Sequence, residues 1–231
     1  MKRLLVLLLV LAATACASSS GFDRGALRSE ISDQTVVTEA DIQKALDAKP
    51  QLPSPFRLAI HLVPSAQQQS RRNDAQWQWL REDKQVLLDA TADLKAKGVV
   101  SDAFVIDVGS VEGNDNRAIR LAAARAGADA VLVVRGTGST DRNGNALALT
   151  YLLIVPAFFV PGTQIDALFV TNASLWDVRN QYLYLSVESD GTAGRTSPAF
   201  SVNETAVLAE AKTDALAGLT KDVAARLASM R

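Results

Sequence analysis

"GADAVLVVRGTG", residues 127–138, is the stretch that decides the fold. Five consecutive apolar residues, Ala130–Val134, follow an aspartate and precede a glycine-containing run. A short uninterrupted apolar run is typical of a strand buried on both faces, as in a parallel sheet. Gly127 marks the end of a preceding helix, which Asn114 or Asp115 can cap at its start. We therefore expect a helix up to Ala126 followed by a central parallel strand.

Two more strands and one more helix precede this central strand. Residues 56–63 alternate, and residues 103–108 form a second short strand. Between them, residues 79–97 are predicted to be helical, with Gly98 as the stop. The apolar side of that helix consists of Val86, Leu87, Ala90 and Leu94. The order strand, helix, strand, helix, strand suits right-handed crossovers, so we predict three parallel strands in a βαβαβ unit.

The pattern changes to an antiparallel one after residue 145. Consecutive strands are indicated at 146–155, 165–178 and 181–189. A tight turn at Arg179–Asn180 joins the last two, which predicts a meander. Residues 136–145 and 190–198 are interpreted as loops because they are rich in glycine and polar residues.

A long helix closes the chain. Ser201 and Glu204 have the spacing of a capping box. The apolar stripe that follows consists of Leu208, Ala211, Ala215, Leu219, Val223 and Leu227. The predicted fold class is α/β (α+β): a mixed sheet with an N-terminal βαβαβ part, an antiparallel meander and a long C-terminal helix.

The region before the first strand divides into two parts. Residues 17–34 contain serine, glycine and charged residues with scattered apolar ones, which is typical of a flexible tether. Thr38 and Asp41 then have capping-box spacing, so a short amphipathic helix with Ile42 and Leu46 is expected before Pro50.

The N-terminus has the layout of a secretory signal peptide. Lys2 and Arg3 precede the uncharged stretch 4–12, and small residues follow at 13–15. Nine apolar residues are too few for a spanning helix, which needs roughly 20. The segment is therefore expected to direct export and not to anchor the chain.

Ala13–Cys16 resembles the lipobox of bacterial lipoproteins. The resemblance implies that Cys16, the single cysteine, is lipidated and becomes the first residue of the mature chain, which then carries three acyl chains. It further implies outer-membrane sorting on the periplasmic face, because Ala17 stands where an inner-membrane retention signal commonly has Asp. The domain organisation expected is a signal peptide at 1–15, a lipidated cysteine and tether at 16–34, and one globular domain at 35–231. The alternative is an ordinary cleaved signal with an incidental cysteine.

Composition and motifs argue against several functions. Lys plus Arg number 24 against 25 Asp plus Glu, so nucleic acid is not an expected partner. No nucleophile elbow and no paired histidines occur, and His61 is the single histidine, interpreted as a packed or half-exposed strand residue. We therefore expect no catalytic residues, no bound metal and no cofactor.

Two groups of side chains are candidates for a partner or membrane surface. Residues 146–162 carry no charge, and Leu152, Phe158 and Phe159 lie within them. A buried central strand is the alternative interpretation of that stretch. Trp77 and Trp79 stand close to several basic residues and form the second candidate, although such residues also pack at helix starts.

Further stretches resemble envelope lipoproteins. "GADAVLVVRGTG", "FFVPGT" (158–163) and "SLWDVRNQYLYLSVES" (174–189) are similar to the rhombotarget lipoproteins, and the domain is similar to the curli-secretion type of lipoprotein. The resemblance implies a non-catalytic lipoprotein that is held to a membrane by its lipid and binds an envelope protein, with a homo-oligomer as a further expectation. The alternative is a small-ligand binder or enzyme that uses loops 109–115 and 136–145, at the carboxyl ends of parallel strands.

Overall fold

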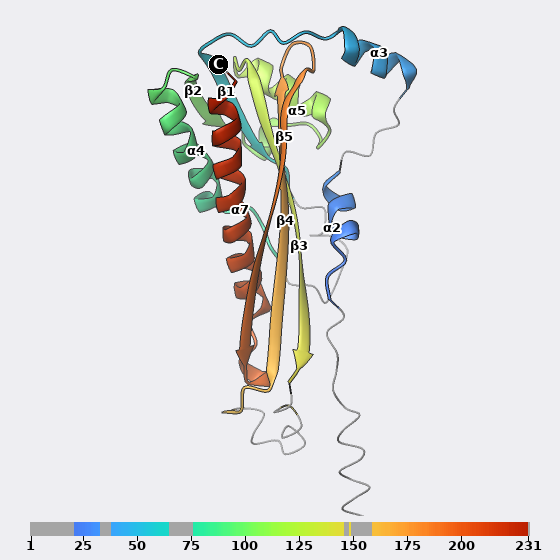
Figure 1. Ribbon diagram of the computed structural model, residues 1–231, viewed down its shortest axis with the longest axis vertical. Helices are drawn as coiled ribbons and strands as arrows, with labels where there is room; N and C mark the ends of the chain where they lie inside the picture. The colour runs from blue at the N-terminus through green and yellow to red at the C-terminus, as the bar shows by residue number, and fades with distance from the viewer. Residues whose placement is uncertain (1–20, 33–37, 65–75, 146–147, 149–158, 231) are drawn as a thin grey trace, which may run out of the picture.

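One mixed sheet organises the molecule in the computed structural model (Figure 1), which describes residues 21–32, 38–64, 76–145, 148 and 159–230. The strands are β1 (Phe56–Leu62), β2 (Val100–Val105), β3 (Ala130–Gly144), β4 (Thr163–Asp177) and β5 (Leu183–Ser197), in the order β2-β1-β3-β4-β5. β1 pairs in parallel with β2 and β3, whereas β4 pairs antiparallel with β3 and β5. The predicted fold class is confirmed.

Helices cover both faces of this sheet. On one face, α4 (Arg81–Ala96) and α7 (Glu204–Ala228) pack on Leu58, Ile60 and their neighbours in β3 and β4. On the other face, α5 (Asn116–Arg125) packs through Ile119 on Val131 and Val133. β1 and the first part of β3 are thus buried on both faces, as their apolar sequence predicts.

β3 is three times longer than its apolar core, so the interpretation of residues 136–145 as a loop is wrong up to Gly144. All fifteen residues of β3 pair with β4, from Ala130 opposite Asp177 to Gly144 opposite Thr163. The glycines allow close packing on the strand, since a Cβ at Gly136 would lie 2.8 Å from the Phe169 ring. A neighbouring aromatic ring therefore occupies the space that a side chain would need.

β5 likewise continues through residues 190–197, which were predicted to be a loop. It pairs with β4 as far as Ser197 opposite Thr163. A Cβ at Gly191 would lie closer than 3.0 Å to Ala211 O and Ala215 N of α7. The glycine in this strand permits the helix backbone to approach, a role that glycine has in strands generally.

The long C-terminal helix has the predicted buried stripe but a different cap. The stripe residues Leu208, Ala211, Ala215, Leu219, Val223 and Leu227 are all buried. The side chain of Asn203, not Ser201, accepts the capping hydrogen bond from Ala206 N at 3.0 Å. Ser201 instead belongs to the 3₁₀ turn Ala199–Ser201.

The segment expected to be a flexible tether contains a packed helix, α2 (Arg24–Ile31). Asp23 caps it by accepting from Ala26 N, and Leu27 and Ile31, one turn apart, pack on Leu168 and Val170 of β4. Two apolar residues at i, i+4 spacing are enough to hold this helix in place, because β4 supplies the apolar surface on which they pack.

The short helix α3 (Glu39–Asp47) has the predicted capping box between Thr38 and Asp41. Its apolar side does not pack on the sheet, since Ile42 is 46% and Leu46 74% exposed. The chain after it is held at the β4–β5 turn, where Gln51 N and Leu52 N both donate to Tyr184 Oη. α3 therefore lies at the end of the molecule opposite to the ends of β3 and β5 (Figure 1).

We predict that Gly191→Ala lowers the free energy of unfolding. The added methyl group would force β5 and α7 apart, and overpacking of this kind costs about 1–3 kcal/mol. Urea denaturation monitored by circular dichroism measures the change. Gly109→Ala is the matched control, because no atom lies within 4 Å of its Cβ position. Equal midpoints for the two variants would contradict the close helix–strand contact.

Candidate functional site

The two candidate tryptophans lie inside the fold. Trp77 is 8% exposed, and its ring packs edge-to-face on Phe169 with a centroid distance of 4.7 Å. Trp79 is half-buried, 5.0 Å from Trp77, and its Nε1 donates to Val63 O at 2.8 Å. This arrangement matches the alternative in which both rings pack before the start of α4, and it leaves Trp77 little surface to offer a partner.

A buried ion pair lies beside the tryptophans. Lys212 Nζ of α7 is 2.5 Å from Asp83 Oδ2 of α4, and their side chains are 4% and 9% exposed. Nζ also donates to Gln78 O at 2.9 Å, and Asp83 Oδ2 accepts from Leu80 N. Buried charges are tolerated when paired and hydrogen-bonded in this way. The pair therefore joins α7 to the first turn of α4.

Sequence analysis missed this pair, although α7 carried a signal for it. Lys212 stands four residues after Leu208 and four before Leu216, in a row of buried apolar positions. A lysine at such a position needs a buried acid. Which acid could not be read from the sequence, because Asp83 lies 129 positions away.

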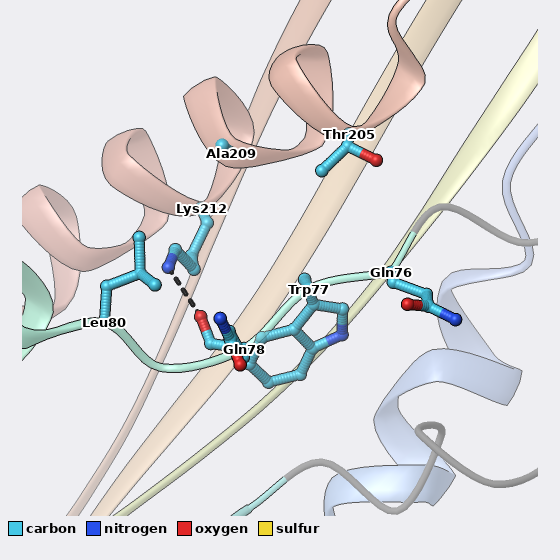
Figure 2. A pocket seen from close by; sticks show the side chains of 7 residues that line it. All are labelled: Gln76, Trp77, Gln78, Leu80, Thr205, Ala209 and Lys212. Atoms are coloured by element: carbon cyan, nitrogen blue, oxygen red, sulfur yellow. Dashed lines mark hydrogen bonds between the residues drawn. The ribbon is translucent and has the colours of Figure 1, made fainter.

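An open pocket of about 370 Å³ lies over the ion pair, between α7 and the segment before α4 (Figure 2). Its lining consists of Gln76, Trp77, Gln78, Leu80, Thr205, Ala209 and Lys212. Among these described residues Lys212 alone is titratable, and Asp83 already neutralises it. The pocket therefore combines a neutral ion pair with amide, hydroxyl and apolar groups.

A second pocket, of about 260 Å³, lies near the carboxyl ends of β1 and β2. Leu62, Trp79 and Ile106 contribute apolar surface to it. Lys84 is its charged member and is bonded to Asp107 Oδ1 at 2.8 Å. Residues 111–115 follow β2 and the 3₁₀ turn Val108–Ser110 as a loop, whereas residues 136–144 continue β3, so the second of the two loops in the alternative hypothesis is a strand up to Gly144.

His61 is fully buried on the α5 face of β1. Its Nδ1 is 3.2 Å from Ile106 O, and Nε2 has no hydrogen-bond partner in the described part of the chain. Burial lowers the pKa of the imidazole, and the charges of Arg135 and Lys84 lower it further. The ring is therefore held neutral within the core.

The most exposed candidate is at the far end of the long strands. Phe159 is 77% exposed, and Phe200, which sequence analysis did not single out, is 67% exposed. Both stand within four residues of the paired strand ends at Thr163 and Ser197. We call this region, residues 142–145, 159–163 and 197–204, the hairpin end. Leu152, Phe158 and the lipidation candidate Cys16 lie outside the described residues.

The described chain begins beside this hairpin end. Gly21 N donates to Asp141 Oδ2 at 3.2 Å. α2 fixes the position of that segment through ion pairs of Arg24 with Asp190 and of Arg28 with Glu188. None of the helices in the described ranges has both the length and the apolar character needed to span a bilayer.

Comparison with known proteins gives distant structural matches and no family. No protein-family model and no curated protein matches the chain. Among solved structures, the PelC dodecamer from Paraburkholderia phytofirmans is 14% identical, with 77% of this chain and 91% of that chain covered and a TM-score of 0.32. A minor lipoprotein from Acinetobacter baumannii is 12% identical, with 78% and 94% covered and a TM-score of 0.33.

Lipoprotein GNA1162 from Neisseria meningitidis is 16% identical, with 74% of this chain and 99% of that chain covered and a TM-score of 0.29. Two of these three solved structures are lipoproteins. Their identities and TM-scores are too low to carry an argument about the fold, site or activity of this chain.

We predict that Lys212→Met destabilises the fold by about 3–5 kcal/mol, because it leaves the Asp83 carboxylate buried without a partner. The double variant Lys212→Met, Asp83→Asn should recover much of this loss, since no unpaired charge remains. Urea denaturation at pH 7 measures both. Lys221→Met, on the exposed side of α7, is the control. A loss below about 1 kcal/mol for the single variant would show that the pair is solvated.

We also predict that His61 makes stability fall on acidification. Because the pKa of His61 is lowered in the folded state, the unfolded chain binds more protons than the native state below about pH 6.5. The free energy of unfolding therefore falls as the pH drops from there. His61→Gln removes this contribution. The measurement is the unfolding free energy of both proteins between pH 7.5 and 5. If their difference stays constant over that range, the imidazole is not held neutral.

Proposed function

We propose that the chain is a lipid-anchored protein of the outer membrane that faces the periplasm and works without catalysis, by binding an envelope protein. The observation that carries the proposal is the signal-like segment that ends in Ala13–Cys16 and resembles a lipobox. A body built on its own core, with four residues between Cys16 and Gly21, which is bonded to the sheet at Asp141, suits such an anchor.

The pairing and burial of the titratable side chains near the pockets support a non-catalytic role. Lys212 and Asp83 neutralise each other, Lys84 is paired with Asp107, and His61 is buried and neutral. The first pair and His61 are buried within the fold, and the Lys84–Asp107 pair lies at the surface. A catalytic acid, base or nucleophile has to reach a substrate, which these arrangements do not favour.

Binding is the role that the remaining surface supports. Exposed apolar side chains lie on α3 and at the hairpin end, at opposite ends of the molecule. Apolar surface of this kind is typical of contacts with a protein or a membrane. The proposal therefore combines attachment to a bilayer with recruitment of a protein partner, and it allows several copies of the chain to assemble.

We predict that Cys16→Ala abolishes incorporation of a labelled fatty acid and releases the protein from the membrane fraction of cells. The sulfur that would carry the lipid is lost, and stable attachment takes at least two acyl chains. Ser20→Ala, outside the lipobox-like stretch, should keep both properties. Labelled palmitate and fractionation measure them. Equal incorporation in wild type and Cys16→Ala would reject the anchor.

The same strains test the binding role. Crosslinking in intact cells should give one defined product between the wild-type chain and an envelope protein, and less of it with Cys16→Ala. A wild-type protein that yields no product and behaves as a stable monomer would count against the binding role, even where the anchor is present.

A further inference from the structure

We infer that the hairpin end of the sheet rests on the bilayer and inserts Phe159 and Phe200 among the lipid headgroups. The inference rests on the proposed anchor at Cys16. It specifies the end of the molecule that contacts the membrane and the two described side chains that make the contact.

The reach of the chain selects this end. Gly21 is bonded to Asp141, and the five residue-to-residue steps from Cys16 to Gly21 span at most about 18 Å when fully extended. Asp141 lies three residues from the end of β3 at Gly144, or about 10 Å, and eleven residues from its start at Ala130, or about 36 Å. The hairpin end is therefore within reach of an anchored chain, whereas the opposite end is twice as far away as the tether can extend.

The attachment point does not swing freely. α2 packs Leu27 and Ile31 on β4, and Arg24 and Arg28 form ion pairs with Asp190 and Glu188 of β5. These contacts hold Gly21 beside β3. A lipid at Cys16 therefore pulls on the sheet close to the hairpin end and not through a long flexible segment.

The side chains at this end suit a lipid surface. Phe159 and Phe200 are the two most exposed aromatic side chains among the described residues, and both flank the strand ends. Aromatic rings are favoured at the level of the headgroups. The nearest charges there, Arg142 and Glu204, lie 3.8 Å apart as an ion pair, so neither approaches the bilayer as an isolated charge.

Quenching by brominated lipids tests the orientation. The lipid-bearing protein is placed in phosphatidylethanolamine–phosphatidylglycerol vesicles with acyl chains brominated near the headgroup. Phe159→Trp and Phe200→Trp each add one fluorophore, and the parent protein gives the background of Trp77, Trp79 and Trp176. Leu46→Trp, on exposed α3 at the opposite end, is the matched control.

We expect the fluorescence added at positions 159 and 200 to fall roughly twofold or more, and that added at position 46 to stay unchanged. Unquenched fluorescence at 159 and 200, as when a protein partner or a second copy covers the phenylalanines, would overturn the inference. Quenching at position 46 alone would overturn it as well, since the other end would then face the lipid.

Mass spectrometry of the same samples separates this inference from the proposed anchor. Acyl chains found on Cys16 together with unquenched fluorescence at 159 and 200 would reject the orientation and leave the anchor standing. If Cys16 proves unmodified, its thiol is the single one in the chain and can be coupled to a maleimide lipid. This coupling restores a tether at the same residue, and the quenching pattern again decides the orientation.

Discussion

The pairing of β3 with β4 along fifteen residues is the constraint on which the rest of the molecule depends. The first five residues of β3 lie in the parallel core, between β1 and β4, with helices on both faces. The remaining ten leave that core and carry the sheet outward as a long antiparallel ribbon. α7 and α2 pack on this ribbon, which β3 and β4 keep in register. One end of the molecule is therefore formed by the strand ends and the other by the parallel core and α3 (Figure 1).

Polar groups inside the fold act mainly to hold its layers together. Lys212 and Asp83 connect α7 to α4, whereas Arg120 of α5 donates to the carbonyl oxygens of Asp177 and Val178 at the β4–β5 turn. Burying such groups costs desolvation free energy, and they fix how the helices pack on the sheet only when every partner is present. The proposed role rests on the exposed surfaces at the two ends of the molecule, which these buried contacts hold in place.

Periodicity in the sequence was sufficient to predict the βαβαβ unit, the antiparallel pair β4–β5 and the stripe of the last helix. The strand predicted at 146–155 lies outside the described residues except for Ala148, and the strand that pairs with β4 on its other side is β3. It failed where a distant element decides the local structure. Gly136 and Gly191 signal loops in the sequence, yet they lie in strands because Phe169 and the α7 backbone occupy the space beside them. The helix α2 was missed for the same reason, since Leu27 and Ile31 form an apolar face only against β4. At the candidate surfaces, exposed Phe159 was singled out, and packing before a helix was the alternative for Trp77, but its partner Phe169 could not be predicted because it lies in a distant strand.

The isolation of α3 has an energetic consequence. Nine residues without a single buried side chain gain no tertiary packing, and helices shorter than about 12–15 residues are marginal in water even with good caps. Unwinding α3 would therefore cost far less free energy than opening the central strands, and its backbone amides would exchange with solvent long before those of β3. Any molecule that covers Ile42 and Leu46 would supply the missing packing, so contact and helix formation at this site would be thermodynamically coupled.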